Sequence, residues 1–165
     1  MRKIITISFI CLLLISCQRE SQIEQIATDY YQTYIEREDF EKFMSFYADS
    51  AIVEDYIFGM KIVGKDQIRT FFDWPHPYFT KLSDENFVIT DQYFTGNTVI
   101  TNGYFNPFKW QDIEVEAMQF SSQLVFNKDG KIIKHIDWIN YPAYLIDYQT
   151  RLNSNDWIPS NSKKN

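Results

Sequence analysis

The chain has 165 residues, of which 45% are hydrophobic and 18% aromatic, and its formal net charge at pH 7 is −6. This composition suits one compact domain with a sizeable hydrophobic core. The negative charge argues against nucleic acid as a partner, because binding to phosphates needs a basic surface.

The first 17 residues, MRKIITISFICLLLISC, have the pattern of a secretory signal. Arg2 and Lys3 precede an apolar run that ends at Ile15, and this run is too short to cross a bilayer. The closing letters LISC resemble the lipobox of bacterial lipoproteins, in which the cysteine, here Cys17, is lipid-modified and becomes the first mature residue. A plain signal or a buried apolar helix is the alternative.

This resemblance implies a lipoprotein signal peptide at 1–16 and a lipidated cysteine with a tether at 17–22. The expected location is the bacterial cell envelope, with the lipid on Cys17 in a membrane. Gln18 is not the aspartate associated with inner-membrane retention, which favours the outer membrane. Cys11 and Cys17 are the only cysteines, so the mature domain can use neither a disulfide nor a cysteine nucleophile.

Two helices are predicted between residues 23 and 47, with REDFE at 37–41 as the turn. Apolar side chains recur at helical spacing in both, so each helix should bury one face. These side chains are Ile23, Ile26, Tyr30 and Tyr34 in the first helix and Phe40, Phe43, Phe46 and Tyr47 in the second.

The next segment predicts a strand, a turn with a short strand, and a third helix. AIVEDYIF at 51–58 is the strand and GMKIVG at 59–64 the turn with its short strand. KDQIRTFFDW should form a helix that starts near Gly64 and is stopped by Pro75 and Pro77.

From Asn86 the chain is typical of an antiparallel sheet. Four strand-like runs follow one another, and the turn sequences TGN at 95–97 and NKDG at 127–130 would join them as hairpins. The runs are NFVITDQYF, NTVITNGYFNPF, IEVEAMQFSSQLVF and KIIKHIDWINY. Helices followed by antiparallel strands predict an α+β domain at 23–148, and residues 149–165 are expected to be a loose tail.

Taken together, two helices, FYADSAIVEDY, GKDQIRTFF and long strands ending in DGKIIKHIDWIN resemble the NTF2-like superfamily, which includes ketosteroid isomerases and SnoaL-like polyketide cyclases. The similarity covers about residues 23–148. It implies a cone in which N-terminal helices pack on a strongly curved antiparallel sheet around a pocket. Many relatives dimerise through the outer sheet face, so a homodimer is compatible with the resemblance.

The resemblance also implies site residues. Asp55 stands where ketosteroid isomerases carry the general base, and Tyr31 where their first helix carries a tyrosine that donates to the substrate oxygen. Ser122 replaces the aspartic acid expected as second donor, and Tyr56 replaces a proline. A hydroxyl donates less strongly than a carboxylic acid, so steroid isomerisation itself is not expected.

The last strand offers a second candidate pair. In KIIKHIDWIN, alternation places His135 and Asp137 on one face, together with Ile139. The resemblance turns this face toward the pocket, and in SnoaL-like cyclases an acid on this strand transfers the proton. An imidazole beside a carboxylate suits proton transfer near pH 7. The opposite face holds Ile132, Lys134, Ile136, Trp138 and Asn140.

Each candidate has a structural alternative. Asp55 could be a turn or capping residue, since aspartate favours turns. Tyr31 could be a core aromatic on its helix. His135 and Asp137 could be solvent-facing if the opposite face, with its isoleucines and Trp138, were the buried one.

Other residues are candidates for contacts with a ligand, and none suggests a metal site. A metal would need Asp and Glu ligands, and no such spacing stands out, so neither metal nor cofactor is expected. The candidate ligand-binding residues are Trp74, Tyr104, Met118, Phe120 and Ser122. Two functions remain: a lipid-anchored module that binds a small apolar molecule, and a cofactor-free acid–base enzyme such as an isomerase, cyclase or dehydratase.

Overall fold

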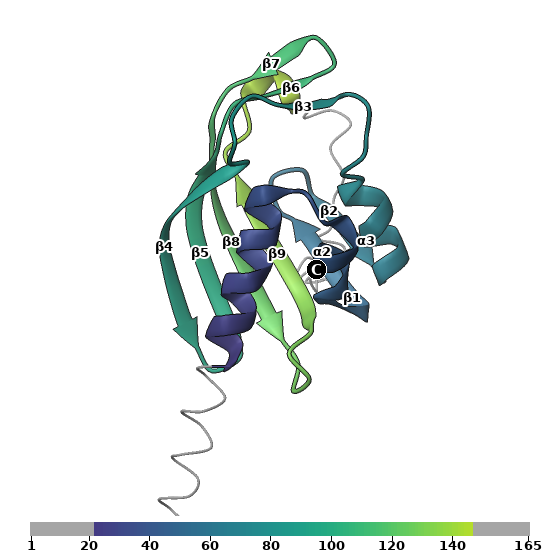
Figure 1. Cartoon of the computed structure of the whole chain (residues 1–165), viewed down its shortest axis with the longest axis vertical. Coiled ribbons are helices and arrows are strands. Elements are labelled where there is room, and N and C mark those ends of the chain that lie inside the picture. Colours follow the sequence, from purple (N-terminus) through teal and green to yellow (C-terminus); the bar gives the residue numbers. More distant parts are fainter. Residues whose placement is uncertain (1–21, 147–165) are drawn as a thin grey trace, which may run out of the picture.

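The computed structural model describes residues 22–146 (Figure 1). The predicted signal peptide at 1–16, the lipid site at Cys17 and the predicted tail at 149–165 lie outside the described residues. Within them, helices pack on a large curved sheet that is antiparallel except at one pair of strands, which confirms the expected α+β fold. No helix in residues 22–146 is long and apolar enough to span a membrane.

The first helix covers residues 22–36 and crosses the concave side of the sheet, as the purple to dark blue ribbon of Figure 1 shows. Ile23 and Tyr30 are buried, as the helical spacing predicted, and Ala27 is buried beside them. The second helix, α2 (Phe40–Ser45), begins at Asp39, whose side chain accepts a hydrogen bond of 2.8 Å from the N–H of Lys42.

The prediction that the second helix reaches Tyr47 is wrong. Tyr47 begins strand β1 (Tyr47–Asp55), where it is paired with Ile132 of β9 (Ile132–Ile139). Phe46 caps α2, and its carbonyl accepts a hydrogen bond of 2.8 Å from the N–H of Ile132. Contacts with a strand distant in sequence therefore override the helical spacing of the aromatic side chains.

The predicted short strand and third helix are confirmed as β2 (Met60–Val63) and α3 (Lys65–Phe72). Gly64 precedes α3 with φ of 93°, a conformation that side chains with a Cβ rarely adopt. The helix ends before Pro75, as proline predicts. This hairpin and helix cover one edge of the cone.

The main sheet has six strands in the order β2-β1-β9-β8-β5-β4. The remaining strands in it are β4 (Phe87–Thr95), β5 (Thr98–Phe105) and β8 (Met118–Phe126). Only the β1–β9 pair is parallel. The sheet bends where β4 shifts register between Ile89 and Asp91, opposite Gly103, at which a Cβ would collide with the carbonyl of Val88.

Two of the predicted strand runs are each divided. After β5, Pro107 interrupts the run, and β6 (Phe108–Trp110) begins a separate hairpin with β7 (Ile113–Val115) ahead of β8. Together with β3 (Phe79–Lys81), these strands form a second sheet in the order β3-β6-β7. Figure 1 shows this small sheet arching over one end of the cone.

Alternation along β9 is broken at its start. The register shifts between Val125 and Phe126, so that Ile132 and Lys134 are paired with successive residues of β8. Ile133 is thus the extra residue of a bulge, and Ile132 is fully buried. The prediction that Ile132 shares the outer face with Lys134 and Trp138 is therefore wrong.

The core lies between the helices and the large sheet and includes Val115 of the small sheet. Phe43 is completely buried, and its ring lies 5.3 Å from that of Tyr30 and 4.5 Å from that of Trp74. A large aromatic side chain in such a site typically contributes about 3–5 kcal/mol to stability. Partly buried side chains that pack against this core, such as Tyr34 and Phe72, also line the cavity of the candidate site.

Candidate functional site

A cavity of about 430 Å³ lies between the first helix, α3, the inner face of the large sheet and the small sheet. Most of its walls are aromatic or aliphatic, and the charged groups on them are Arg37, Asp55 and Asp137. The other lining residues are Tyr34, Phe58, Phe71, Phe72, Phe79, Asn86, Phe105, Phe108, Trp110, Ile113, Val115, Met118, Ile139, Tyr141 and Leu145. An apolar pocket with a few polar groups is the usual form of a small-molecule site.

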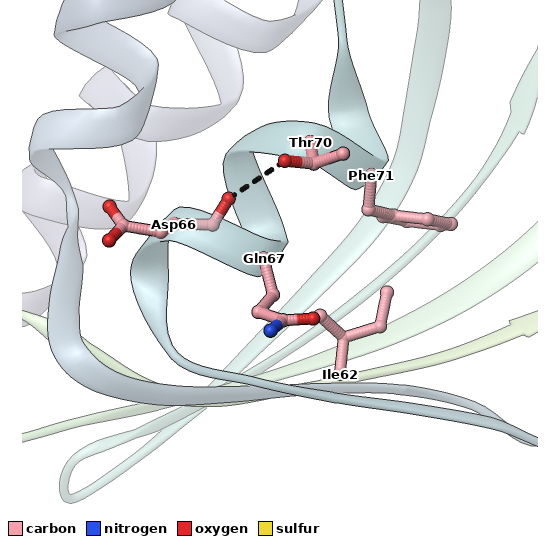
Figure 2. Close-up of a pocket in the computed structure, with 5 residues that line it drawn as sticks. All are labelled: Ile62, Asp66, Gln67, Thr70 and Phe71. Atoms are coloured by element: carbon pink, nitrogen blue, oxygen red, sulfur yellow. Dashed lines mark hydrogen bonds between the residues drawn. The ribbon is translucent and has the colours of Figure 1, made fainter.

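A second hollow lies on the outside of α3 and is a poorer candidate. Figure 2 shows Gln67 and Ile62 side by side along it, with the Asp66 carboxylate turned away from Phe71. Thr70 Oγ1 donates to the Asp66 carbonyl over 3.1 Å, a contact internal to the helix. With Asp66 as its only ionisable group, this hollow offers no acid–base pair.

Asp55 is both a turn residue and a cavity residue. Its carboxylate Oδ1 accepts from the N–H groups of Ile57 at 2.9 Å and Phe58 at 2.8 Å, which closes the turn after β1. Its Oδ2 accepts from the Tyr141 hydroxyl at 2.6 Å. The residue is only 3% exposed although it borders the cavity. The two interpretations of Asp55, as a turn residue and as an acid that faces a pocket, are therefore compatible.

Burial raises the pKa of Asp55 above its ordinary value. The hydrogen bond from Tyr141 and the two backbone N–H groups oppose this shift, and the charge of Asp137 adds to it. Asp137 is the direct neighbour of Asp55 across the β1–β9 pair. Burial and the neighbouring negative charge therefore both favour the protonated form of Asp55.

Glu54, the preceding residue, has the opposite environment. Alternation puts it on the outer face of the sheet, where Lys61 Nζ lies 3.2 Å from one carboxylate oxygen and Lys134 Nζ 3.1 Å from the other. Burial disfavours its charge, but the two ammonium groups outweigh burial and lower the pKa of Glu54. The pair of acids in the sequence is thus divided between the two faces of β1.

His135 lies in a buried chain of hydrogen bonds that ends at the cavity. Its Nε2 is 3.0 Å from Asp137 Oδ1 and its Nδ1 is 2.8 Å from the Tyr47 hydroxyl, which in turn is 2.9 Å from the Tyr30 hydroxyl. A neutral imidazole satisfies both contacts when Nε2–H donates to Asp137 and Nδ1 accepts from Tyr47. This arrangement orients the Asp137 carboxylate on the cavity wall.

Tyr31 and Ser122 lie deeper than the cavity. Both are buried, and neither hydroxyl makes a hydrogen bond within residues 22–146. Burial raises the pKa of Tyr31, and the nearby hydroxyls of Thr101 and Ser122 act against this shift. Neither residue lines the cavity, so the structure groups Asp55, His135 and Asp137 together and leaves Tyr31 apart from them.

The predicted ligand-binding residues divide in the same way. Met118 lines the cavity. Trp74 and Phe120 support lining residues from behind, because Trp74 stacks on Tyr34 at 5.8 Å and Phe120 packs against Phe105 at 5.0 Å. Tyr104 is 37% exposed on the outer face, whereas its neighbour Phe105 faces inward and lines the cavity.

The structure adds four polar lining residues that the sequence pattern did not single out as ligand contacts: Tyr34, Arg37, Asn86 and Tyr141. Arg37 fell in a predicted turn, and Tyr141 follows the last strand in WINYP, where no motif marks it. The helical spacing of Tyr34 indicated burial but not a cavity. Within residues 22–146, no cluster of three or more His, Cys, Asp or Glu side chains could hold a metal ion.

Comparison with known families gives a match to the SnoaL-like domain over residues 27–135, which spans most of the first helix and of the large sheet and ends two residues before Asp137. No curated protein matches the chain in sequence.

Solved structures share the fold at low sequence identity. A protein assigned as a SnoaL-like polyketide cyclase from Shewanella putrefaciens has 22% identity and a TM-score of 0.60, covering 72% of this chain and 90% of its own. An LEH-like epoxide hydrolase from M. tuberculosis has 15% identity and a TM-score of 0.59, covering 72% and 83%. A protein with a ketosteroid isomerase-like fold from Catenulispora acidiphila, in complex with trimethylamine, has 17% identity and a TM-score of 0.57. The match covers 81% of this chain and 97% of that protein.

Proposed function

Because the chain belongs to the family of SnoaL-like domains, we propose that its cavity binds one small, largely apolar molecule whose polar group contacts one of the charged side chains in the cavity wall. The observation that carries this proposal is an aromatic cavity of about 430 Å³ with two neighbouring carboxyl groups in its wall. Burial of apolar ligand surface supplies affinity, and the carboxyl groups supply orientation.

Binding is tested by thermal unfolding of the protein with 2-naphthol, a bicyclic probe with one hydroxyl group. A ligand at one hundred times its dissociation constant stabilises the folded state by about 2.7 kcal/mol, which raises the melting temperature. Phe105→Ala should weaken this effect, and Tyr104→Ala, its neighbour on the outer face, should not. Equal loss of binding in both variants, or no binding to the original protein, contradicts the proposal.

A second candidate function is proton transfer without a cofactor. It is favoured by the contact of His135 with Asp137 and by the position of Asp137 beside Asp55. Asp137 would take a proton from a carbon next to a carbonyl, and the neighbouring carboxyl group in its protonated form would donate to the oxygen.

Deuterium exchange of 2-tetralone in D₂O, followed by NMR, tests this candidate. An enzyme should accelerate exchange next to the carbonyl, and Asp137→Asn should abolish the acceleration while 2-naphthol still binds. If 2-naphthol binds and exchange proceeds at the rate of buffer alone, the cavity binds ligands without this chemistry.

We further propose that the domain is anchored to a membrane of the cell envelope by a lipid on Cys17, with the outer membrane expected from Gln18. The support is the LISC segment after a short apolar run. In a bacterial host, Cys17→Ser should move the protein from the membrane fraction to the soluble fraction. A variant that is still processed and membrane-bound contradicts the lipid anchor. Whether two copies associate is a separate question, answered by sedimentation.

A further inference from the structure

Among the described residues 22–146, Arg37 is the one cationic side chain that lines the cavity, and nothing in the site described above uses it. It follows the helix of residues 22–36, and its guanidinium lies 4.0 Å from the ring centre of Phe79 and 5.4 Å from that of Trp74. Stacking against two rings fixes the plane of the guanidinium and leaves its edge, which carries the N–H donors, available to another group.

The donors of Arg37 lack a protein partner in the described residues. Its Nε is buried without a hydrogen bond, and no carboxylate of residues 22–146 lies within ion-pair distance of its side chain. Arg69 differs, because it holds both carboxylate oxygens of Glu41, with Nη2 at 2.7 Å from one of them. A buried donor on a charged group that lacks a partner is costly, so an acceptor from outside the chain is expected.

The backbone at this position is also unusual. Arg37 has φ of 55°, in the left-handed region where a helix commonly ends with glycine. Helix-end carbonyls near it already have partners, because Lys81 Nζ donates to the Glu36 carbonyl and the Asn86 N–H to that of Ile35. The side chain of Arg37 thus occupies a position that favours glycine, and the carbonyls at the helix end do not depend on it for hydrogen bonds. This combination suggests that the side chain has a function of its own.

We propose that Arg37 binds the carboxylate of an apolar monocarboxylic acid whose hydrocarbon part fills the aromatic cavity. This inference rests on the proposed ligand-binding function and names the class of ligand. The cavity wall carries charges of both signs, because Arg37 and the acids Asp55 and Asp137 all line it. The anionic end of the ligand is attracted to Arg37 and repelled by Asp137, which sets one orientation in the cavity.

The test compares 2-naphthoate with 2-naphthamide, its neutral isostere, by calorimetry on the whole chain at pH 7. The carboxylate should bind about tenfold or more tightly than the amide. Arg37→Gln should remove this preference and leave amide binding unchanged, and Arg69→Gln is the matched control because its guanidinium is paired outside the cavity. A preference that survives Arg37→Gln, or that disappears equally in Arg69→Gln, overturns the proposal.

A second measurement does not depend on the stability of a variant. The ¹⁵N–¹H resonance of Arg37 Nε, identified by its absence in Arg37→Gln, should shift on addition of 2-naphthoate and stay in place with 2-naphthamide, while that of Arg69 is constant. No shift on saturation with 2-naphthoate overturns the role of Arg37. If 2-naphthol and 2-naphthamide bind but the carboxylate has no advantage, the proposed binding function stands and this inference alone fails.

Discussion

The two faces of the β1–β9 pair hold carboxylates in opposite environments, although Glu54 and Asp55 are adjacent in the chain. On the outer face, two lysines lower the pKa of Glu54 in spite of burial. On the inner face, burial and a neighbouring acid raise the pKa of Asp55 in spite of three hydrogen bonds. Position on the strand decides which face an acid occupies, and the partners found there decide its charge.

The strongest test removes the cations from the outer face. Lys61→Met together with Lys134→Met leaves Glu54 buried beside apolar groups, and we expect a loss of about 3 kcal/mol at pH 7, because an uncompensated buried charge is costly. The pKa of Glu54 should then rise, so the double variant should regain stability as the pH falls. Urea unfolding at pH 7 and pH 5 measures both effects. Lys109→Met together with Lys128→Met is a control that removes the same charge elsewhere.

The next test concerns the support of the inner face. Tyr47→Phe removes the hydroxyl between Tyr30 and His135 and leaves two buried polar atoms without partners. We expect a loss of about 1–3 kcal/mol in unfolding free energy. The ¹⁵N shifts of the His135 ring report whether Nδ1 loses its hydrogen bond. Unchanged ring shifts in a folded variant contradict the buried chain of hydrogen bonds.

Asp55 provides the pH test of the inner face. Its pKa in the folded protein is raised, so its contribution to stability is fully present below the pKa of the unfolded chain and is lost as the pH rises through the folded pKa. Asp55→Asn does not ionise, so it does not lose stability as the pH rises. Its side-chain oxygen can still accept the hydrogen bonds from the N–H groups of Ile57 and Phe58. Its stability relative to the original protein should therefore improve between pH 4 and pH 7, by roughly 1 kcal/mol, the size of a single net hydrogen bond. A relative stability that declines over this interval shows that Asp55 has a lowered pKa.

The smallest expected effect is at Tyr141. Its hydroxyl donates to Asp55, so Tyr141→Phe should raise the pKa of Asp55 further and cost about 1 kcal/mol or less. An NMR titration of the Asp55 carboxyl carbon measures the change. Tyr144→Phe, at an exposed tyrosine three residues later, should leave that titration unaltered.

Local patterns in the sequence were sufficient for elements whose limits are set by local residues. Gly64 and Pro75 bound α3, and alternation places the inward residues of β5 and β8 correctly once their register is known. The family motif placed Asp55 at the end of β1, where it does border the cavity. These features depend on neighbours along the chain or on a pattern shared with relatives.

The sequence does not encode the other features in any local pattern. Tyr47 continues a helical spacing, but it belongs to β1 because it is paired with Ile132 of β9. In β9, the extra residue Ile133 moves Ile132 to the other face of the sheet. Tyr104 and Phe105 are both aromatic, and only the register with β8 decides which of them faces inward. Arg37 and Tyr141 acquire meaning through contacts with residues far along the chain.

The parallel pairing of β1 with β9 has a consequence for folding kinetics. It joins the beginning of the domain to its end, since Tyr47 and His135 are 88 residues apart and Asp55 and Tyr141 are 86. Contacts between residues so far apart in sequence are among the slowest to form, because the entropy of closing a long loop is lost before the contacts contribute any stabilising energy. The hairpins β4–β5 and β8–β9 can form earlier from local contacts. We therefore expect the acidic wall formed by Asp55 and Asp137 to arise in the last steps of folding, so that a chain with only its hairpins formed would have no ligand site.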